Sequence, residues 1–430
     1  MAKKSSIALA IILGTIVAVG AFAQTKATIS FWAAAVTPER DQFFKSVVAK
    51  FEAANPGIHV DYLSVPGDLT SYRQKWDVAF AAGSDPDITN DFTAKQVEMG
   101  ALEPLDKYFN AWKGKDSVNP ALIAGNRTYD PKNHYLYALP YSAQPWVMWV
   151  RPDWFRKAGL KVPTTWNEFF SDVAKLTDKA NDTYGTSIRG GGGSANTLEM
   201  LMYSYSGILS YFDESGKCTI NNPKNVEFVE RYLGLFDVST PEDDLTKGWT
   251  QLAATFQSGK AAIVIHNLGS ASSHFKAFEG DYSKFQAAPF PKSVKGYVQH
   301  PGLMPLGLTM SKNAKNKDAV WKFMAFYLSK EINSDYCKLY GEIPANKEAA
   351  SADWINGLPY MSMGSKLLTS PSTKFSGTPY YLPGYSTIQT QMEPKIQQAM
   401  LKQITAKQLL DEWAQLLEKE KTAYDAKASK

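Results

Sequence analysis

The fold of this chain is decided by residues 28–63, which read TISFWAAAVTPERDQFFKSVVAKFEAANPGIHVDYL. An apolar-rich strand candidate opens the stretch at Thr28–Trp32, and a second runs from Ile58 to Leu63. Between them, Thr37 and Pro38 match a helix N-cap followed by proline at the first helical position. Apolar side chains then recur on one helical face, at Phe43, Phe44, Val47, Val48 and Phe51. Strand–helix–strand is the unit that builds parallel sheets, so the stretch predicts an α/β fold.

The same alternation continues along the chain. Tyr72, Trp76, Ala79 and Phe80 have helical spacing, and Gly83 is placed to end that helix. Residues 165–168 form a capping box, Thr-Trp-Asn-Glu, at the start of another helix. Apolar patterns predict further helices near 226–236, 320–327 and 405–424, and strands near 87–88, 137–150 and 260–265.

The bulk composition indicates a two-domain globular protein. The chain has 430 residues, of which 44% are hydrophobic and 20% charged. A single domain usually holds roughly 100–200 residues, so two domains are expected. The formal net charge is only +4, and no run of Lys and Arg exceeds isolated pairs. Nucleic acid as the main partner would require a concentrated basic face, so we expect none.

The N-terminus has the pattern of a secretory signal peptide. Lys3 and Lys4 precede an apolar stretch, Ile7–Val19, and Ala21-Phe22-Ala23 is a small-x-small cleavage site. We expect cleavage after Ala23 and export to the periplasm. A membrane anchor is the alternative, although the apolar stretch is shorter than the roughly 20 residues of a spanning helix. No cysteine follows this stretch, which excludes a lipid anchor there.

Neither a metal site nor a catalytic motif stands out. The two cysteines, Cys218 and Cys337, could form a bridge in an oxidising compartment or remain buried thiols. No Cys and His set has zinc spacing, and we expect no metal and no cofactor. The sequence contains no G-x-S-x-G elbow, no H-E-x-x-H helix and no phosphate-binding G-x-x-x-x-G-K-[ST] loop.

Several short motifs occur in order across nearly the whole chain after residue 23. They are FEAANPGIHV at 51–60, AAGSDPDI at 81–88, GALEPL at 100–105, YALP at 137–140, WFRKAG at 154–159, PTTWNEF at 163–169, FQSGKAA at 256–262, SKN at 311–313 and GEIPA at 341–345. Together they resemble the extracellular solute-binding proteins of family 1, the sugar-type binding proteins of ATP-driven importers. One departure is His300-Pro301-Gly302, where the family has Gly-Gly.

The resemblance implies two α/β lobes, each a sheet flanked by helices, joined by a hinge that the chain crosses several times. Lobe I would hold residues 25–139 and 288–329, and lobe II residues 140–287 and 330–430. The implied function is capture of a mono- or oligosaccharide between the lobes and its delivery to the membrane permease of an ABC importer. The protein would act as a monomer and would not be an enzyme. Two alternatives stay open: a non-sugar, sugar-phosphate or polyamine solute, and a secreted carbohydrate-active enzyme.

A sugar site needs polar side chains around the ring plane and an aromatic platform against the ring face. Open α/β sheets bind ligands at the loops after their strands. The resulting candidates follow strands or open helices, with core packing or solvation as the alternative for each. They are Trp32, Glu39, Asn90, Asp91, Tyr141, Gln144, Trp146, Trp249, Asn267 and His300.

Two further features leave the solute class open. Gly190–Gly193 is either a flexible turn or a loop that lets a ligand approach the backbone. A phosphorylated solute would require Arg or Lys in the site. Four arginines are available for that role: Arg40, Arg73, Arg151 and Arg189.

Overall fold

The computed structural model describes residues 27–34, 36–65, 69–300 and 305–428. The predicted signal peptide lies outside these residues. Within them, no helix combines the length and the apolar character needed to cross a bilayer. Two separate sheets organise the described chain, one of six strands and one of four, and a two-stranded ribbon joins β9 (Val298–His300) to β12 (Thr373–Phe375).

The opening strand–helix–strand prediction is confirmed. Strand β1 (Ala27–Ala34) pairs in parallel with β2 (Ile58–Val65), and α1 (Pro38–Ala54) connects them. Thr37 caps this helix, because its Oγ1 accepts from the Arg40 backbone N–H at 3.4 Å. The apolar face of α1 packs on the sheet, where the Phe44 ring lies 5.4 Å from Phe31 in an edge-on contact.

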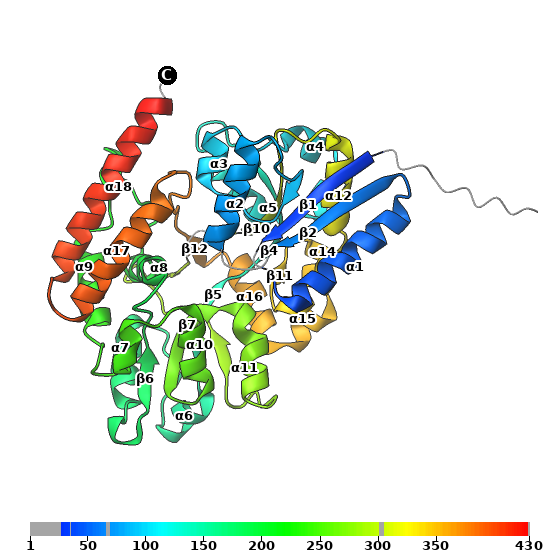
Figure 1. The fold of residues 1–430 in the computed structure, drawn as a ribbon. Helices are drawn as coiled ribbons and strands as arrows, with labels where there is room; N and C mark the ends of the chain where they lie inside the picture. The colour runs from blue at the N-terminus through cyan, green and yellow to red at the C-terminus, as the bar shows by residue number, and fades with distance from the viewer. Residues whose placement is uncertain (1–26, 35, 66–68, 301–304, 429–430) are drawn as a thin grey trace, which may run out of the picture.

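The six-stranded sheet has the order β11-β4-β10-β3-β1-β2. Its parallel part ends with β3 (Ile88–Thr89), and the other three strands are β4 (Ala138–Ala143), β10 (Pro305–Met310) and β11 (Ile343–Pro344). The helices of this lobe include α2 (Leu69–Ala81), α3 (Ala94–Glu98), α4 (Asp106–Ala111), α5 (Pro120–Arg127), α12 (Lys317–Tyr327), α13 (Lys330–Tyr340) and α14 (Lys347–Ala350). Gly83 follows α2 with a φ of 68°, as expected of a helix-ending glycine. We call this unit the first lobe; Figure 1 shows it at the upper right.

The four-stranded sheet has the order β6-β7-β5-β8 and forms the second lobe. Its strands are β5 (Trp146–Val150), β6 (Tyr184–Ser187), β7 (Ala261–Asn267) and β8 (Gln286–Ala288). The flanking helices include α6 (Pro152–Lys157), α7 (Trp166–Lys175), α8 (Ser194–Ser206), α9 (Pro223–Leu233), α10 (Trp249–Gln257) and α11 (Ala271–Ala277). The capping box predicted at Thr165 and Glu168 is present at the start of α7.

The C-terminal part of the chain packs mainly on the second lobe. Helices α17 (Tyr385–Met400) and α18 (Ala406–Ala428) pack on α8 and α9 and are drawn in orange and red in Figure 1. Two shorter helices, α15 (Asp353–Gly357) and α16 (Pro359–Thr369), precede them, and α16 contacts both β8 and β11. Across the lobes, the Tyr380 ring stacks on Tyr129 with centroids 5.8 Å apart.

Strand pairing differs from the expected division of the chain at three places. All of β4, through Ala143, lies in the six-stranded sheet rather than ending there at residue 139. The expected return at residue 288 comes later, since β8 pairs with β5 and β10 is the first strand back in the six-stranded sheet. Helix α13 and strand β11 also belong to the first lobe, because β11 pairs with β4. Local apolar patterns do not reveal which sheet a strand joins, because the partner strands supply that information.

Cys218 and Cys337 are both free and buried. Cys218 lies in the apolar core of the second lobe, whereas Cys337 lies on α13 in the core of the first. The structure therefore shows two separate buried thiols and no bridge between them.

Candidate solute-binding site between the two sheets

The strand ends of the first lobe gather three predicted residues. Because β1 and β3 are parallel and Trp32 is opposite Thr89, Trp32 lies beside the residues that follow β3. Asn90 Oδ1 accepts from the Ala34 backbone N–H at 2.7 Å, which ties Asn90 to the last residue of β1. Trp32 and Asn90 are both half-buried. The result is a surface of aromatic and amide groups at the carboxyl edge of the sheet.

Asp91 lies at the same edge but already has a charged partner. Arg73 donates to its two carboxylate oxygens at 2.7 and 2.8 Å. This two-pronged pairing holds the carboxylate in a fixed orientation. A carboxylate has about four acceptor positions, so the pairing leaves capacity for hydroxyl donors.

The second lobe brings together three of the predicted residues at one end of its sheet. Trp146 opens β5 directly opposite Asn267, which ends β7. The Trp249 ring, at the start of α10, meets Trp146 edge-on with centroids 4.8 Å apart. All three are half-buried. Two indole rings and an amide thus share one small surface, and these are groups that recognise the apolar and polar parts of a sugar ring.

His266 supports this aromatic pair from within. Its ring stacks on Trp249 with centroids 3.4 Å apart, and its Nε2 lies 3.2 Å from the Trp249 carbonyl oxygen. Burial lowers the pKa of His266 to about 4, the hydrogen bond to Trp249 opposes that effect, and the charge of Arg189 adds to it. The ring is therefore neutral at pH 7, with its proton on Nε2 to donate to the carbonyl.

A polar network crosses from the second lobe to the first. Asn267 Nδ2 donates to Gln144 Oε1 at 2.6 Å, and Gln144 Nε2 donates to Glu342. Glu342 also accepts from Ser142, and Arg40 Nη2 lies 3.4 Å from its Oε1. We call this set the junction network. Gln144 connects the two lobes at the point where the chain passes from β4 to β5.

Glu342 is fully buried at the centre of this network. Burial raises the pKa of its carboxyl, and Arg40 and the surrounding hydrogen bonds oppose this only in part. Burial also disfavours the charge on Arg40, yet Tyr336 and Glu342 hold the pKa of its guanidinium above the ordinary value. A buried acid with several donors is costly to leave unpaired, so the network favours one arrangement of the junction.

Three of the ten predicted residues lie away from these surfaces. Tyr141 is buried in the first-lobe core, edge-on to Tyr336 at 5.1 Å. His300 is also buried, and its Nε2 lies 2.7 Å from the Trp146 carbonyl oxygen, so it supports Trp146 from behind. Glu39 is exposed in the first turn of α1, where its own backbone N–H and the Thr37 hydroxyl lower its pKa.

The sequence alone did not single out Glu342 or His266 as part of this arrangement. Glu342 lies within the GEIPA motif, and His266 immediately precedes Asn267 in β7. Its place in that motif is the sequence feature that could have identified Glu342 as part of the junction network. For His266, the corresponding feature is its place near the end of a buried strand.

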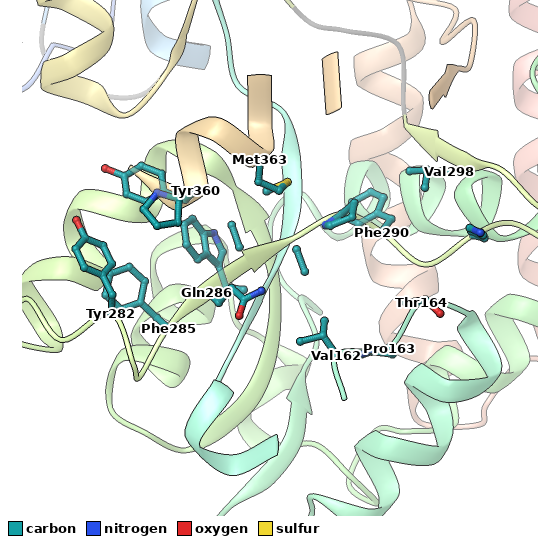
Figure 2. Close-up of a pocket in the computed structure, with 16 residues that line it drawn as sticks. Val162, Pro163, Thr164, Tyr282, Phe285, Gln286, Phe290, Val298, Tyr360 and Met363 are labelled. Carbon is teal, nitrogen blue, oxygen red and sulfur yellow. The ribbon is translucent and has the colours of Figure 1, made fainter. Parts of the chain in front are cut away.

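A separate cavity of about 600 Å³ lies along the outer edge of the second sheet, between β8, residues 162–164 and α16. Figure 2 shows Tyr282, Phe285 and Tyr360 gathered at one end of it, with Val162 and Pro163 beyond Gln286. None of the ten predicted residues lines it. The lining is mainly aromatic and aliphatic, so it lacks the ring of polar groups that sugar hydroxyls require.

Within residues 27–34, 36–65, 69–300 and 305–428, no cluster of three or more His, Cys, Asp or Glu side chains could hold a metal ion.

Two α/β lobes joined by several chain crossings are the architecture of the periplasmic binding proteins. The chain belongs to the bacterial extracellular solute-binding protein family, whose profile matches residues 34–333. A binding protein of Brucella abortus (strain 2308) is 26% identical over 376 residues, covering 85% of each chain. The maltotriose-binding protein of Pyrococcus abyssi is 25% identical over 328 residues, covering 75% of this chain and 67% of its own length.

A solved structure shows the same fold. It is an ABC transporter solute-binding protein of Thermotoga lettingae TMO with bound α-D-tagatose. The match has a TM-score of 0.74 at 21% sequence identity, and it covers 92% of this chain and 99% of that one. The predicted family and the predicted two-lobed α/β fold are therefore confirmed.

Proposed function

We propose that this protein captures a carbohydrate between its two lobes and delivers it to an ABC importer. The observation that carries the proposal is the surface formed by Trp146, Trp249 and Asn267, in which two indole rings adjoin an amide. Such a surface matches the apolar faces and polar rim of a sugar ring. The relatives that bind maltotriose and tagatose support this choice of solute class.

The site would be completed by the strand ends of the first lobe, where Trp32, Asn90 and Asp91 lie. In this arrangement Gln144 belongs to the junction and Glu39 to the exposed rim. Tyr141 and His300 act from behind the surface, by packing and by holding the Trp146 backbone. Lobe I would comprise residues 27–143 with 305–350, and lobe II most of the remainder.

Capture would proceed by closure of one lobe on the other. A solute that contacts both lobes binds the closed form better and shifts the population toward it. The contacts that already join the lobes include the junction network, the Tyr129–Tyr380 stack and the packing of α16 on both β8 and β11. The importer's membrane permease would then recognise the closed form, and no catalytic step is needed.

We infer export to the periplasm with cleavage after Ala23, and action as a monomer. Membership of an extracellular family supports export.

Native mass spectrometry of protein purified from the periplasm, without refolding, tests the proposal. We expect a bound mass equal to a mono- or oligosaccharide, lost on unfolding and absent from a Trp146→Ala, Trp249→Ala double variant. A bound amino acid, peptide or polyamine in the same site would overturn the carbohydrate assignment.

A further inference from the structure

Three of the four arginines that the sequence offers for an anionic solute are already neutralised by a carboxylate. Arg40 lies 3.4 Å from Glu342. The other two form two-pronged pairs, Arg73 with Asp91 and Arg151 with Asp153. Each of these guanidinium groups therefore has its counter-ion within the protein.

Arg189 is different. No carboxylate lies within ion-pair distance of its guanidinium among the described residues, and its buried Nε has no hydrogen-bond partner there. The acid whose charge acts on it is Glu393, but that carboxylate accepts a hydrogen bond from the Gly193 backbone N–H instead. Arg189 is thus a half-buried cation without a paired anion.

The chain is shaped to hold this guanidinium in place. Its central carbon lies 5.2 Å from the centroid of the Trp249 ring, in a cation–π contact. On another side lies Gly193, where an added Cβ would come within 2.1 Å of Arg189 Nη2. Gly193 also has a φ of 82°, so a larger residue would be strained as well as obstructive. Gly193 therefore makes room for the arginine.

Arg189 lies at the same edge as the proposed sugar surface. Strands β6 and β7 are parallel, with Ser187 opposite Val264, so Arg189 follows β6 as His266 and Asn267 complete β7. Burial lowers the pKa of Arg189 to about 10, which leaves the group charged at pH 7. A positive charge held partly out of water without an ion-paired carboxylate is unfavourable, and a bound anion would relieve that cost.

We propose that the captured carbohydrate carries an anionic group, a carboxylate or a phosphate, and that Arg189 binds it beside the Trp146–Trp249 pair. This inference rests on the proposed function and narrows its solute class. A guanidinium can donate two parallel hydrogen bonds to either group. A neutral sugar would leave the cation uncompensated, so Arg189 would act as a specificity-determining residue.

The test is isothermal titration of the mature protein with a panel of mono- and disaccharides. Each neutral sugar is paired with its uronic acid and with its phosphate ester. We expect one acidic sugar to bind at least about 10-fold more tightly than its neutral parent. The neutral parent has no anionic group and so cannot accept charge-assisted hydrogen bonds from Arg189. Tight binding of the uronic acid alone assigns a carboxylate, and tight binding of the ester alone assigns a phosphate.

Arg189→Gln should weaken binding of the acidic sugar about 10- to 100-fold and should change the affinity for the neutral parent little. Arg231→Gln is the matched control, because it removes the same charge from an arginine that also covers a ring, that of Phe170. If Arg189→Gln fails to fold by circular dichroism, Arg189→Lys keeps the charge without the two-pronged geometry and should give an intermediate loss.

The outcomes separate this inference from the function on which it rests. A neutral sugar that binds as tightly as its acid, or an acidic sugar unaffected in both Arg189 variants, overturns the anionic assignment and leaves carbohydrate capture standing. Failure of every carbohydrate to bind overturns the proposed function, and this inference with it.

Discussion

The side-chain amide of Asn267 donates a hydrogen bond of 2.6 Å to Oε1 of Gln144. Gln144 in turn donates to Glu342, an acid fully buried in the first lobe. A single chain of hydrogen bonds therefore runs from the last residue of β7 to the interior of the opposite sheet. A residue of the proposed solute surface is thus coupled directly to the junction between the lobes.

Gln144→Ala should destabilise the protein, because it removes two hydrogen bonds. The buried Glu342 carboxylate loses the donor Gln144 Nε2, and the Asn267 amide loses the acceptor Gln144 Oε1. We expect the free energy of unfolding, measured by urea denaturation, to fall by about 1–3 kcal/mol. Gln42→Ala on the exposed face of α1 is the control and should change it by less than about 0.5 kcal/mol. Equal unfolding free energies for Gln144→Ala and the unaltered protein would show that the network contributes nothing to the junction.

Aromatic truncation should affect binding more than stability. Trp146→Ala and Trp249→Ala are each expected to raise the dissociation constant for the carbohydrate about 10-fold or more, because each variant loses an indole that contacts the sugar ring. Trp32→Ala and Asp91→Ala should also weaken binding if the first lobe completes the site. Trp112→Ala, which removes an indole that packs on Trp321, is the matched control. Unchanged affinity in all four variants would place the site elsewhere.

Glu199 makes the second lobe sensitive to pH. Its carboxyl is fully buried between α8 and α17, where Tyr385 donates to Oε2 at 2.5 Å and Gln389 at 2.7 Å. Burial raises the pKa of Glu199 from 4.5 to about 8. The folded state thus holds this proton more tightly than the unfolded chain does. The contribution of the protonated Glu199 to the free energy of unfolding is therefore full below about pH 4.5 and is lost as the pH rises through about 8.

The variant Glu199→Gln keeps the neutral form at every pH. Relative to this variant, the unaltered protein should lose on the order of 2–4 kcal/mol of unfolding free energy between about pH 5 and pH 9. The neighbouring Tyr203, Tyr211 and Tyr385 have pKa values raised well above the ordinary one by burial, so they stay neutral over this range. Parallel stability curves for the two proteins would contradict the raised pKa of Glu199.

Export predicts a defined N-terminus. Intact-mass measurement of the protein from the periplasmic fraction should give a chain that starts at Gln24, because Ala21 and Ala23 flank the cleavage site. A Ala23→Asp variant, which spoils the small-residue site, should accumulate with its leader attached. A mature mass that retains residues 7–19 would favour a membrane anchor instead.

Local patterns predicted most of the elements well. The N-cap at Thr37, the capping box at Thr165 and the helix end at Gly83 each depend on a few adjacent residues, so their signals lie within one segment of sequence. Trp32 and Asn90 were each expected at the end of a strand, and the parallel pairing of β1 with β3, with Trp32 opposite Thr89, brings them together.

The parts that sequence did not predict depend on partners distant in the chain. Glu342 meets Gln144 across 198 positions, and β11 joins β4 through two residue pairs, neither of which leaves a local pattern. Tyr141 and Trp146 are aromatic residues of consecutive strands, β4 and β5, yet Tyr141 packs into a core and Trp146 is half-buried at a surface. Which arginines form ion pairs likewise depends on distant residues, and the sequence does not show that Arg40, Arg73 and Arg151 have carboxylate partners whereas Arg189 has none within ion-pair distance among the described residues.

Thermal unfolding of the mature protein against a library of neutral sugars, sugar acids, sugar phosphates, polyamines and peptides tests carbohydrate capture most directly. A ligand at 100 times its dissociation constant stabilises the folded state by about 2.7 kcal/mol, which raises the melting temperature by several degrees. We predict such a rise with at least one carbohydrate and its loss in the Trp146→Ala, Trp249→Ala double variant. A rise with only polyamines or peptides, or the same rise in the double variant, would contradict carbohydrate capture at this site.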